Sequence, residues 1–91
     1  MNFTLTDSAK DKLEELKSRQ QPIKLAITGY SWCGAELGIV SEKQSENDVV
    51  YNTEGFDLIV SGDLVGAING AEIDYKNGVF KKGFEVFPKF K

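Results

Sequence analysis

Ile23-Lys24-Leu25-Ala26-Ile27-Thr28 is the stretch that constrains the architecture most. Its apolar residues at 23, 25 and 27 alternate with Lys, Ala and Thr, which is the pattern of a strand with one face on a core. Gln20-Gln21-Pro22 stands before it, and Gly29-Tyr30-Ser31-Trp32-Cys33-Gly34-Ala35 follows it. Because glycines bracket the two aromatics and the single cysteine, we expect this second segment to form a loop.

On the N-terminal side, the pattern predicts a brief strand over 2–5 and then a helix from Asp7 to Ser18 or Arg19. Thr6 suits the N-cap position, because its hydroxyl can accept a hydrogen bond from the first turn. Apolar residues at helical spacing form one narrow stripe: Ala9, Leu13 and Leu16. Opposite charges four residues apart are expected on the solvated faces: Lys10 with Glu14, and Glu15 with Arg19.

On the C-terminal side, short apolar runs separated by turn-forming residues predict further strands over 36–41, 49–52, 56–60, 72–75 and 83–87. Asn69-Gly70 and Asn77-Gly78 each predict a tight turn, since both residue types tolerate positive φ. The segment 63–68 fits a helical turn and an extended segment equally. The whole series predicts a single α+β, mainly β domain over 1–91, with one N-terminal helix on small twisted, mostly antiparallel sheets.

Composition limits the classes of function. The chain has 91 residues, 41% hydrophobic and 27% charged, which is ordinary for one globular domain. A formal net charge of -3 argues against nucleic-acid binding, which needs clustered Lys and Arg. No apolar run reaches the roughly 20 residues of a membrane span, and no signal-peptide pattern opens the chain. We therefore expect a soluble, cytoplasmic protein that binds neither nucleic acid nor membrane.

One cluster departs from the ordinary composition and the net negative charge of the chain, and it is a basic and aromatic tail: Phe80, Lys81, Lys82, Phe84, Phe87, Lys89, Phe90 and Lys91. We expect it to be an edge strand whose lysines stay in water and discourage edge-to-edge pairing. The alternative is contact with RNA or with an acidic partner.

Cys33 is the candidate for metal or thiol chemistry, as a thiolate ligand or a nucleophile, and its alternative is a small buried hydrophobe. The chain has no histidine, so no Cys–His pair can form and we do not expect an enzyme. Tyr30 and Trp32 either form a partner-binding patch or close one end of the core.

Several segments, in this order and spacing, carry a family resemblance: Phe3-Thr4-Leu5-Thr6-Asp7-Ser8-Ala9, Ile23-Lys24-Leu25-Ala26-Ile27, the loop with Cys33, Asn47-Asp48-Val49-Val50-Tyr51, Phe56-Asp57-Leu58-Ile59-Val60, Gly70-Ala71-Glu72-Ile73-Asp74-Tyr75 and Gly83-Phe84-Glu85-Val86. Over about 2–88 the chain resembles the HesB/IscA-type (A-type) iron-sulfur cluster biogenesis domain. The resemblance implies a helix on small twisted sheets and a role in assembling or carrying iron or iron-sulfur clusters. It also implies a homodimer or other iron-sulfur assembly proteins as partners.

The chain departs from that family in its cysteines. Cluster-binding members carry a C-terminal Cys-Gly-Cys, whereas this sequence reads Pro88-Lys89-Phe90-Lys91 there. A cluster takes about four thiolates, and one cysteine per chain gives two in a dimer. One hypothesis is an accessory or carrier domain that binds iron or a labile cluster through Cys33 between subunits. A monomer that binds no metal is an equally weighted expectation. The alternative is a metal-free interaction module that uses Tyr30 and Trp32.

Overall fold

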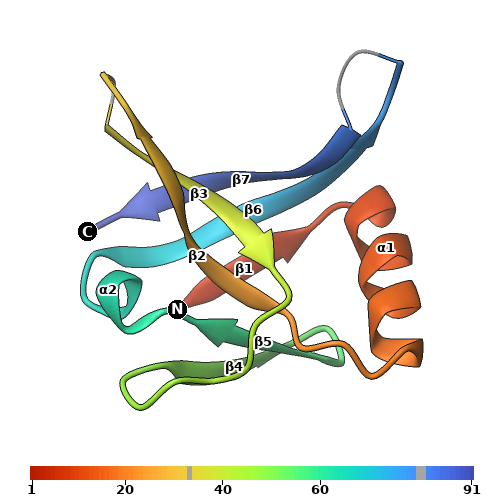
Figure 1. Cartoon of the computed structure of the whole chain (residues 1–91), viewed down its shortest axis with the longest axis horizontal. Helices are drawn as coiled ribbons and strands as arrows, with labels where there is room; N and C mark the ends of the chain where they lie inside the picture. The colour runs from red at the N-terminus through yellow and green to blue at the C-terminus, as the bar shows by residue number, and fades with distance from the viewer. Residues whose placement is uncertain (33, 80–81) are drawn as a thin grey trace.

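A computed structural model describes residues 1–32, 34–79 and 82–91, so Cys33, Phe80 and Lys81 lie outside the described residues. The elements in chain order are β1 (Asn2–Leu5), α1 (Asp7–Ser18), β2 (Lys24–Ser31), β3 (Gly34–Val40), β4 (Val49–Thr53), β5 (Phe56–Val60), α2 (Gly62–Val65), β6 (Ile68–Asn77) and β7 (Lys82–Phe90) (Figure 1). In the part of the chain that the structure describes, no helix is both long and apolar enough to cross a membrane.

The described strands form two mixed sheets, ordered β1-β6-β7 and β3-β2-β5-β4. The pairs β2–β3, β4–β5 and β6–β7 are antiparallel, while β1–β6 and β2–β5 are parallel. Edge strands of the two sheets meet twice: β3 contacts β7, and Phe3 of β1 packs on Tyr51 of β4 with ring centroids 6.0 Å apart. The predicted fold class of one helix on small, mostly antiparallel sheets is confirmed.

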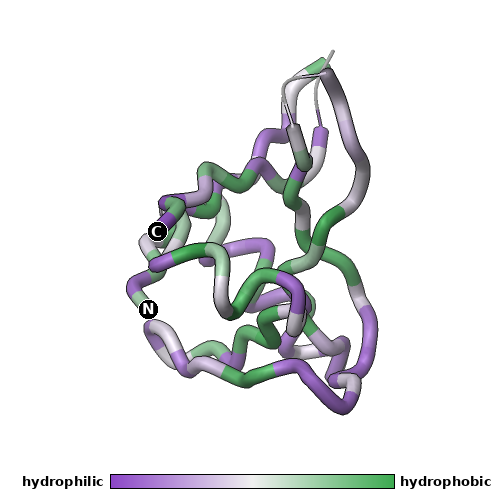
Figure 2. Tube along the Cα trace, turned by 90° about the vertical axis from the view of Figure 1, so that its left-hand side faces the viewer, coloured by the Kyte–Doolittle hydropathy of each residue, from purple (hydrophilic) through white to green (hydrophobic). Residues whose placement is uncertain are grey.

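The core lies between the sheets, where apolar side chains from both are removed from water. Its largest fully buried members come from α1, β2, β5 and β6: Leu13, Leu25, Leu58, Val60, Ile68 and Ile73. In β5 the alternation is visible, because Leu58 and Val60 enter the core while Asp57 between Phe56 and Leu58 stays exposed. Figure 2 shows how hydrophobic and hydrophilic stretches follow one another along the trace.

Helix α1 begins where the sequence predicts. The Thr6 hydroxyl accepts a hydrogen bond from the Ala9 N–H at 3.2 Å and donates to Asp74 Oδ1 at 2.7 Å. The cap therefore also fixes the helix N-terminus to β6. Ala9 and Leu13 are buried and Leu16 packs against the core, which confirms the apolar stripe.

One charge pairing predicted for the helix is wrong. Lys10 pairs with Glu54 at 2.9 Å, in the turn between β4 and β5, rather than with Glu14. The helix face that carries Lys10 lies against that turn, so a tertiary partner replaces the local one. The pair of Glu15 with Arg19 is present at 2.9 Å, as predicted.

Strands extend into two segments that were predicted to lie outside them. The loop expected over 29–35 is the end of a hairpin, because β2 runs to Ser31 and β3 begins at Gly34. The turn expected at Asn69-Gly70 lies inside β6, at a register shift, and β1 pairs along it. A Cβ at Gly70 would overlap the Asn2 backbone, so this glycine serves close strand approach rather than a turn. The ambiguous 63–68 segment begins as a helical turn, α2.

A buried ion pair connects β2 to two distant segments. Lys24 Nζ lies 2.8 Å from Asp48 Oδ2, and the two side chains are only 8% and 5% exposed. Asp48 also accepts hydrogen bonds from the Ser45 N–H at 2.8 Å and the Gly62 N–H at 3.0 Å. The Lys24 ammonium and these N–H groups lower the pKa of Asp48 to about 2, and Asp48 raises the pKa of Lys24.

We predict that Asp48→Asn lowers the melting temperature, because it leaves the Lys24 ammonium buried without its main counter-charge. Asp57→Asn is the matched control, since Asp57 is exposed and bonds only Asn52 among the contacts described. In thermal unfolding followed by circular dichroism, Asp48→Asn should melt at a lower temperature than Asp57→Asn. Equal melting temperatures for both would contradict the role assigned to the ion pair.

The pH dependence of the same pair has a defined sign. Because folding lowers the pKa of Asp48 from 3.8 to about 2, the ionised carboxylate stabilises the folded chain fully above 3.8. That contribution is lost as the pH falls from 3.8 through about 2. The difference in melting temperature between wild type and Asp48→Asn should therefore shrink across this window, and a constant difference would contradict the assignment.

We predict that Leu13→Ala lowers the free energy of unfolding by about 2–5 kcal/mol, because it opens a cavity in the core. Leu13 is 2% exposed at the centre of the stripe that docks α1. Urea unfolding measures the effect, and Glu14→Ala on the exposed face of the same helix is the control. If both substitutions left the midpoint unchanged, α1 would not be docked through Leu13.

Candidate functional site

The β2–β3 hairpin carries the residues that the sequence singled out. Its strands pair from Lys24 opposite Val40 to Ser31 opposite Gly34, and the hairpin projects from the body of the protein (Figure 1). Tyr30 and Trp32 are 80% and 99% exposed, so they do not close the core. Cys33 lies outside the described residues, and the fates of its side chain proposed from the sequence remain predictions. Its two neighbours, Trp32 and Gly34, are both exposed.

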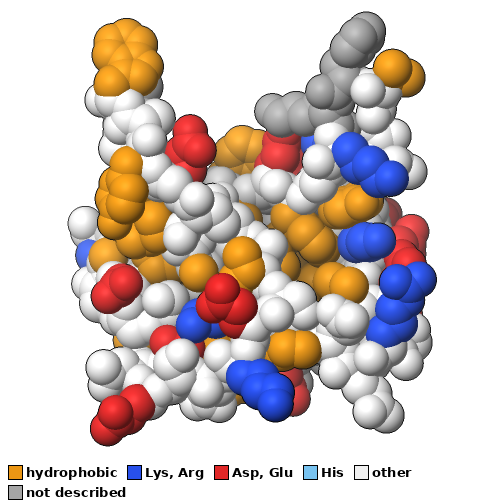
Figure 3. All heavy atoms as spheres, viewed as in Figure 1, with side chains coloured by type: hydrophobic (Ala, Val, Ile, Leu, Met, Phe, Trp, Pro, Cys, Tyr) orange, Lys and Arg blue, Asp and Glu red, His pale blue; other side chains and the backbone are white. Residues whose placement is uncertain are grey.

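A groove of about 700 Å³ runs where this hairpin meets β7. Its apolar lining comes from both edge strands: Leu37, Ile39, Phe84, Val86 and Pro88. In Figure 3, hydrophobic side chains gather below the hollow between the two projecting hairpins. The groove has an apolar wall on each sheet, and Glu36 and Glu85 are its acidic members.

The predicted tail is strand β7, at the edge of its sheet as expected. Phe87 and Phe90 are 52% and 63% exposed, and Lys82 and Lys89 are exposed beside them. Phe84 instead turns inward, where it meets Tyr75 edge-on with ring centroids 4.9 Å apart. Lys76 near the end of β6 lies 3.0 Å from Asp74, and the hydrogen bond to Asp74 together with its charge raises the pKa of Lys76. The β6–β7 hairpin is therefore basic and aromatic along β7, its outer strand.

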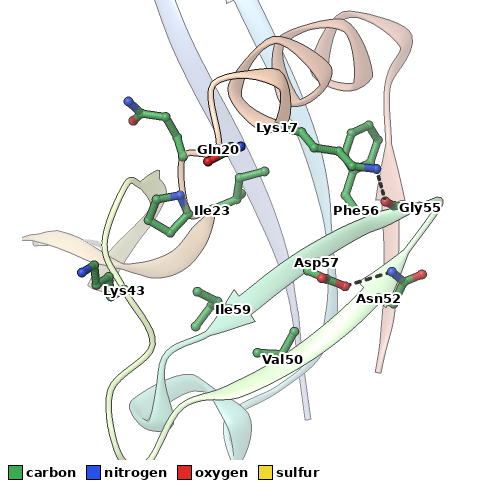
Figure 4. A pocket seen from close by; sticks show the side chains of 12 residues that line it. Lys17, Gln20, Ile23, Lys43, Val50, Asn52, Gly55, Phe56, Asp57 and Ile59 are labelled. Carbon is green, nitrogen blue, oxygen red and sulfur yellow. Dashed lines mark hydrogen bonds between the residues drawn. The ribbon is translucent and has the colours of Figure 1, made fainter.

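A second pocket, which the sequence did not predict, lies between the C-terminal end of α1 and the outer face of β4 and β5 (Figure 4). Its volume is about 590 Å³, and Val50 and Ile59 form part of its floor. The sequence feature that could have indicated this pocket is the unbroken apolar run 58–60. A strand covered on one face only would alternate apolar and polar residues, so this run indicates cover on both faces. Ile59 is 8% exposed although it points away from the main core.

Three polar side chains of this pocket bond other lining residues. Lys17 Nζ donates to the Gly55 carbonyl at 3.0 Å and lies 5.6 Å from the centre of the Phe56 ring. The Asn52 amide donates to Asp57 at 3.0 Å (Figure 4). These pairings connect the end of α1 to the turn before β5, and β4 to β5.

Metal ligation by carboxylates has no support in the described residues. They contain no group of three or more His, Cys, Asp or Glu side chains arranged around a common point. Asp48 and Asp74, whose pKa values are lowered by hydrogen bonds and by nearby lysines, are already committed to structural contacts.

Residues 1–86 match the model of a family described as iron-sulphur cluster biosynthesis. A protein from Bacillus subtilis named uncharacterized protein SufA is 27% identical over 88 residues, covering 91% of this chain and 73% of that protein. A putative iron-sulfur cluster insertion protein ErpA from Paraburkholderia phymatum is 30% identical over 82 residues, covering 85% of this chain and 68% of the relative.

Solved structures have the same fold. SufA of Escherichia coli, described as involved in biosynthesis of iron-sulfur clusters, matches with a TM-score of 0.64 and 25% identity, over 93% of this chain and 78% of that one. IscA solved with a 2Fe-2S cluster matches with a TM-score of 0.66 over 96% and 85% of the two chains, and at 15% identity it supports the fold alone. The match over residues 1–86 and these likenesses agree with the resemblance seen in the sequence, and the chain belongs to the iron-sulphur cluster biosynthesis family.

Proposed function

We propose that this protein is a non-enzymatic accessory or carrier in iron-sulfur cluster biogenesis, and that Cys33 supplies a thiolate to iron or a labile cluster held between subunits. The observation that carries the proposal is the exposure of Trp32 and Gly34, which flank position 33 at the end of a projecting hairpin. An exposed hairpin end can approach a second chain or a recipient protein without unfolding. Family membership supplies the class of cargo.

Ligand counting gives the proposal its stoichiometry. The chain has one cysteine and no histidine, whereas a cluster takes about four thiolates. Two chains supply two of them, and the remainder must come from small thiols or from a thiol-bearing partner. Cargo held through so few protein ligands is easily released, as a carrier requires. The lack of histidine, the commonest general base, also supports a non-enzymatic role.

We expect anaerobic incubation with ferrous iron and sulfide to give the wild type a visible absorption band and bound iron, and to give Cys33→Ser neither. Iron counting and size-exclusion chromatography of the coloured species would measure the iron per chain and the number of chains that share it. A second variant, Cys33→Ser with Ser41→Cys, keeps one thiol but moves it to an exposed position on the C-terminal side of β3.

The relocated thiol distinguishes a site from adventitious binding. The carrier proposal requires that the double variant stay colourless, because an exposed thiol away from the hairpin end lacks the same neighbours. Equal iron in the wild type and the double variant would mean that any exposed thiol suffices. Iron in Cys33→Ser, or none in the wild type, would remove Cys33 from the proposal.

A second candidate function is a metal-free interaction module, and the exposure of Tyr30 and Trp32 favours it. Large aromatic side chains of this kind are frequent anchors in protein interfaces. Trp32 is the single tryptophan of the chain, so its fluorescence reports on this surface directly. The module requires a blue shift when a purified iron-sulfur assembly protein is added to the apoprotein, and loss of binding in Trp32→Ala. Unchanged emission with such partners would leave the carrier as the sole candidate.

A further inference from the structure

The chain contains two Asn-Gly pairs whose surroundings differ. Asn69 lies inside β6, and the backbone of the following Gly70 is buried against Asn2 of β1. Asn77 is the last residue of β6, and both it and Gly78 are exposed. The same dipeptide thus occurs once within a three-stranded sheet and once at the open end of a hairpin.

We propose that Asn77 is a site of spontaneous deamidation, and that the fold protects Asn69 from the same reaction. The Gly78 backbone nitrogen attacks the side-chain carbonyl carbon of Asn77 while a hydroxide or buffer base removes its proton. A C–N bond forms, the amide C–N bond breaks, and ammonia leaves with the proton it gains. Water then adds to one of the two carbonyls of the five-membered succinimide and opens it to aspartate or isoaspartate, with no change in oxidation state.

Ring closure requires rotation about the Cα–C bond of the asparagine backbone and about its Cα–Cβ bond, so that the nitrogen of the next residue reaches the side-chain carbonyl carbon. At Asn69 that rotation is opposed from two directions, because Gly70 pairs with Asn2 of β1 and with Lys89 of β7. The Asn2 backbone lies so close to Gly70 that a Cβ there would overlap the Asn2 carbonyl, so the Gly70 backbone is held closely against β1. Reaction at Asn69 therefore requires local separation of β1 from β6.

At Asn77 the restraint is smaller. Its cross-strand partner is Lys82, and no strand residue follows it in β6. Gly78 also has no side chain to obstruct the approach of its nitrogen. Asn77 and Gly78 can therefore reach the reactive geometry without separation of β1 from β6.

The products change the charge and the register of this hairpin. A carboxylate at position 77 stands opposite Lys82 and next to Lys76, and it takes the formal net charge from -3 to -4. Isoaspartate also adds a methylene to the main chain, which removes the Asn77–Lys82 pairing from the ladder. The modification thus acts at the end of β6, where Asn77 pairs with Lys82.

Incubation of the full chain in mildly alkaline buffer, below its melting temperature, tests the proposal by peptide mapping. Cleavage after lysine separates the two sites, because Asn69 falls in the peptide 44–76 and Asn77 in the peptide 77–81. We expect Asn77 to lose its amide at least about tenfold faster than Asn69, which corresponds to about 1.4 kcal/mol of opening free energy. Isoaspartyl methyltransferase and methyl donor should label the 77–81 product.

The unfolded chain is the matched control, since both pairs are then equally free. In denaturant the two rates should converge, mainly through faster reaction at Asn69. Asn77→Gln should abolish the acidic species that ion exchange separates, because the longer side chain forms the ring poorly. Equal rates at the two sites in the folded chain, or an unmodified Asn77, would overturn the proposal, and neither result depends on Cys33 or on bound iron.

Discussion

The contact on which the rest of this fold depends is the buried ion pair between Lys24 and Asp48. Lys24 opens β2, the strand that pairs with both β3 and β5, and it stands opposite Val40 and Ile59. Asp48 meanwhile holds the N–H groups of Ser45 and Gly62. One carboxylate therefore connects the start of β2 to the segment before β4 and to the start of α2. Such a pair is better explained by specificity of register than by net stabilisation, because desolvation offsets much of its attraction.

Local signals in the sequence were sufficient for some elements and insufficient for others. Helix α1 was predictable because its cap, Thr6, and its apolar stripe are both encoded within a few turns. Strand β5 was predictable because a run of apolar residues is bounded by turn residues. The extension of β2 through Gly29 and Tyr30 was not, since pairing with β3 outweighs their weak local preference. Asn69-Gly70 was wrongly predicted as a turn for the same reason, because Gly70 pairs with β1, which is far away in the sequence.

In the candidate site, too, features encoded locally were predictable and features that depend on tertiary contacts were not. The order of segments was enough to indicate the family, and it placed Tyr30 and Trp32 beside Cys33, but their exposure depended on how far the hairpin projects. The pocket over Val50 and Ile59 was missed because it forms only when the end of α1 lies over β4 and β5. The pairing of Lys10 with Glu54 was missed likewise, because no sequence rule relates a helix face to a turn so distant.

The parallel pairing of β1 with β6 has a consequence for how the chain reaches this state. Thr6 and its partner Asp74 are 68 residues apart in sequence, and β1 has no sheet neighbour other than β6 among the described strands. During synthesis β1 must therefore wait, unpaired, until β6 has emerged, while the β2–β3 hairpin can close at once. Because closing so long a loop is entropically costly and gives no early reward, we expect the N-terminal strand to join last. A chaperone that shields Phe3 and Leu5 during that interval would act on the slowest step of the pathway.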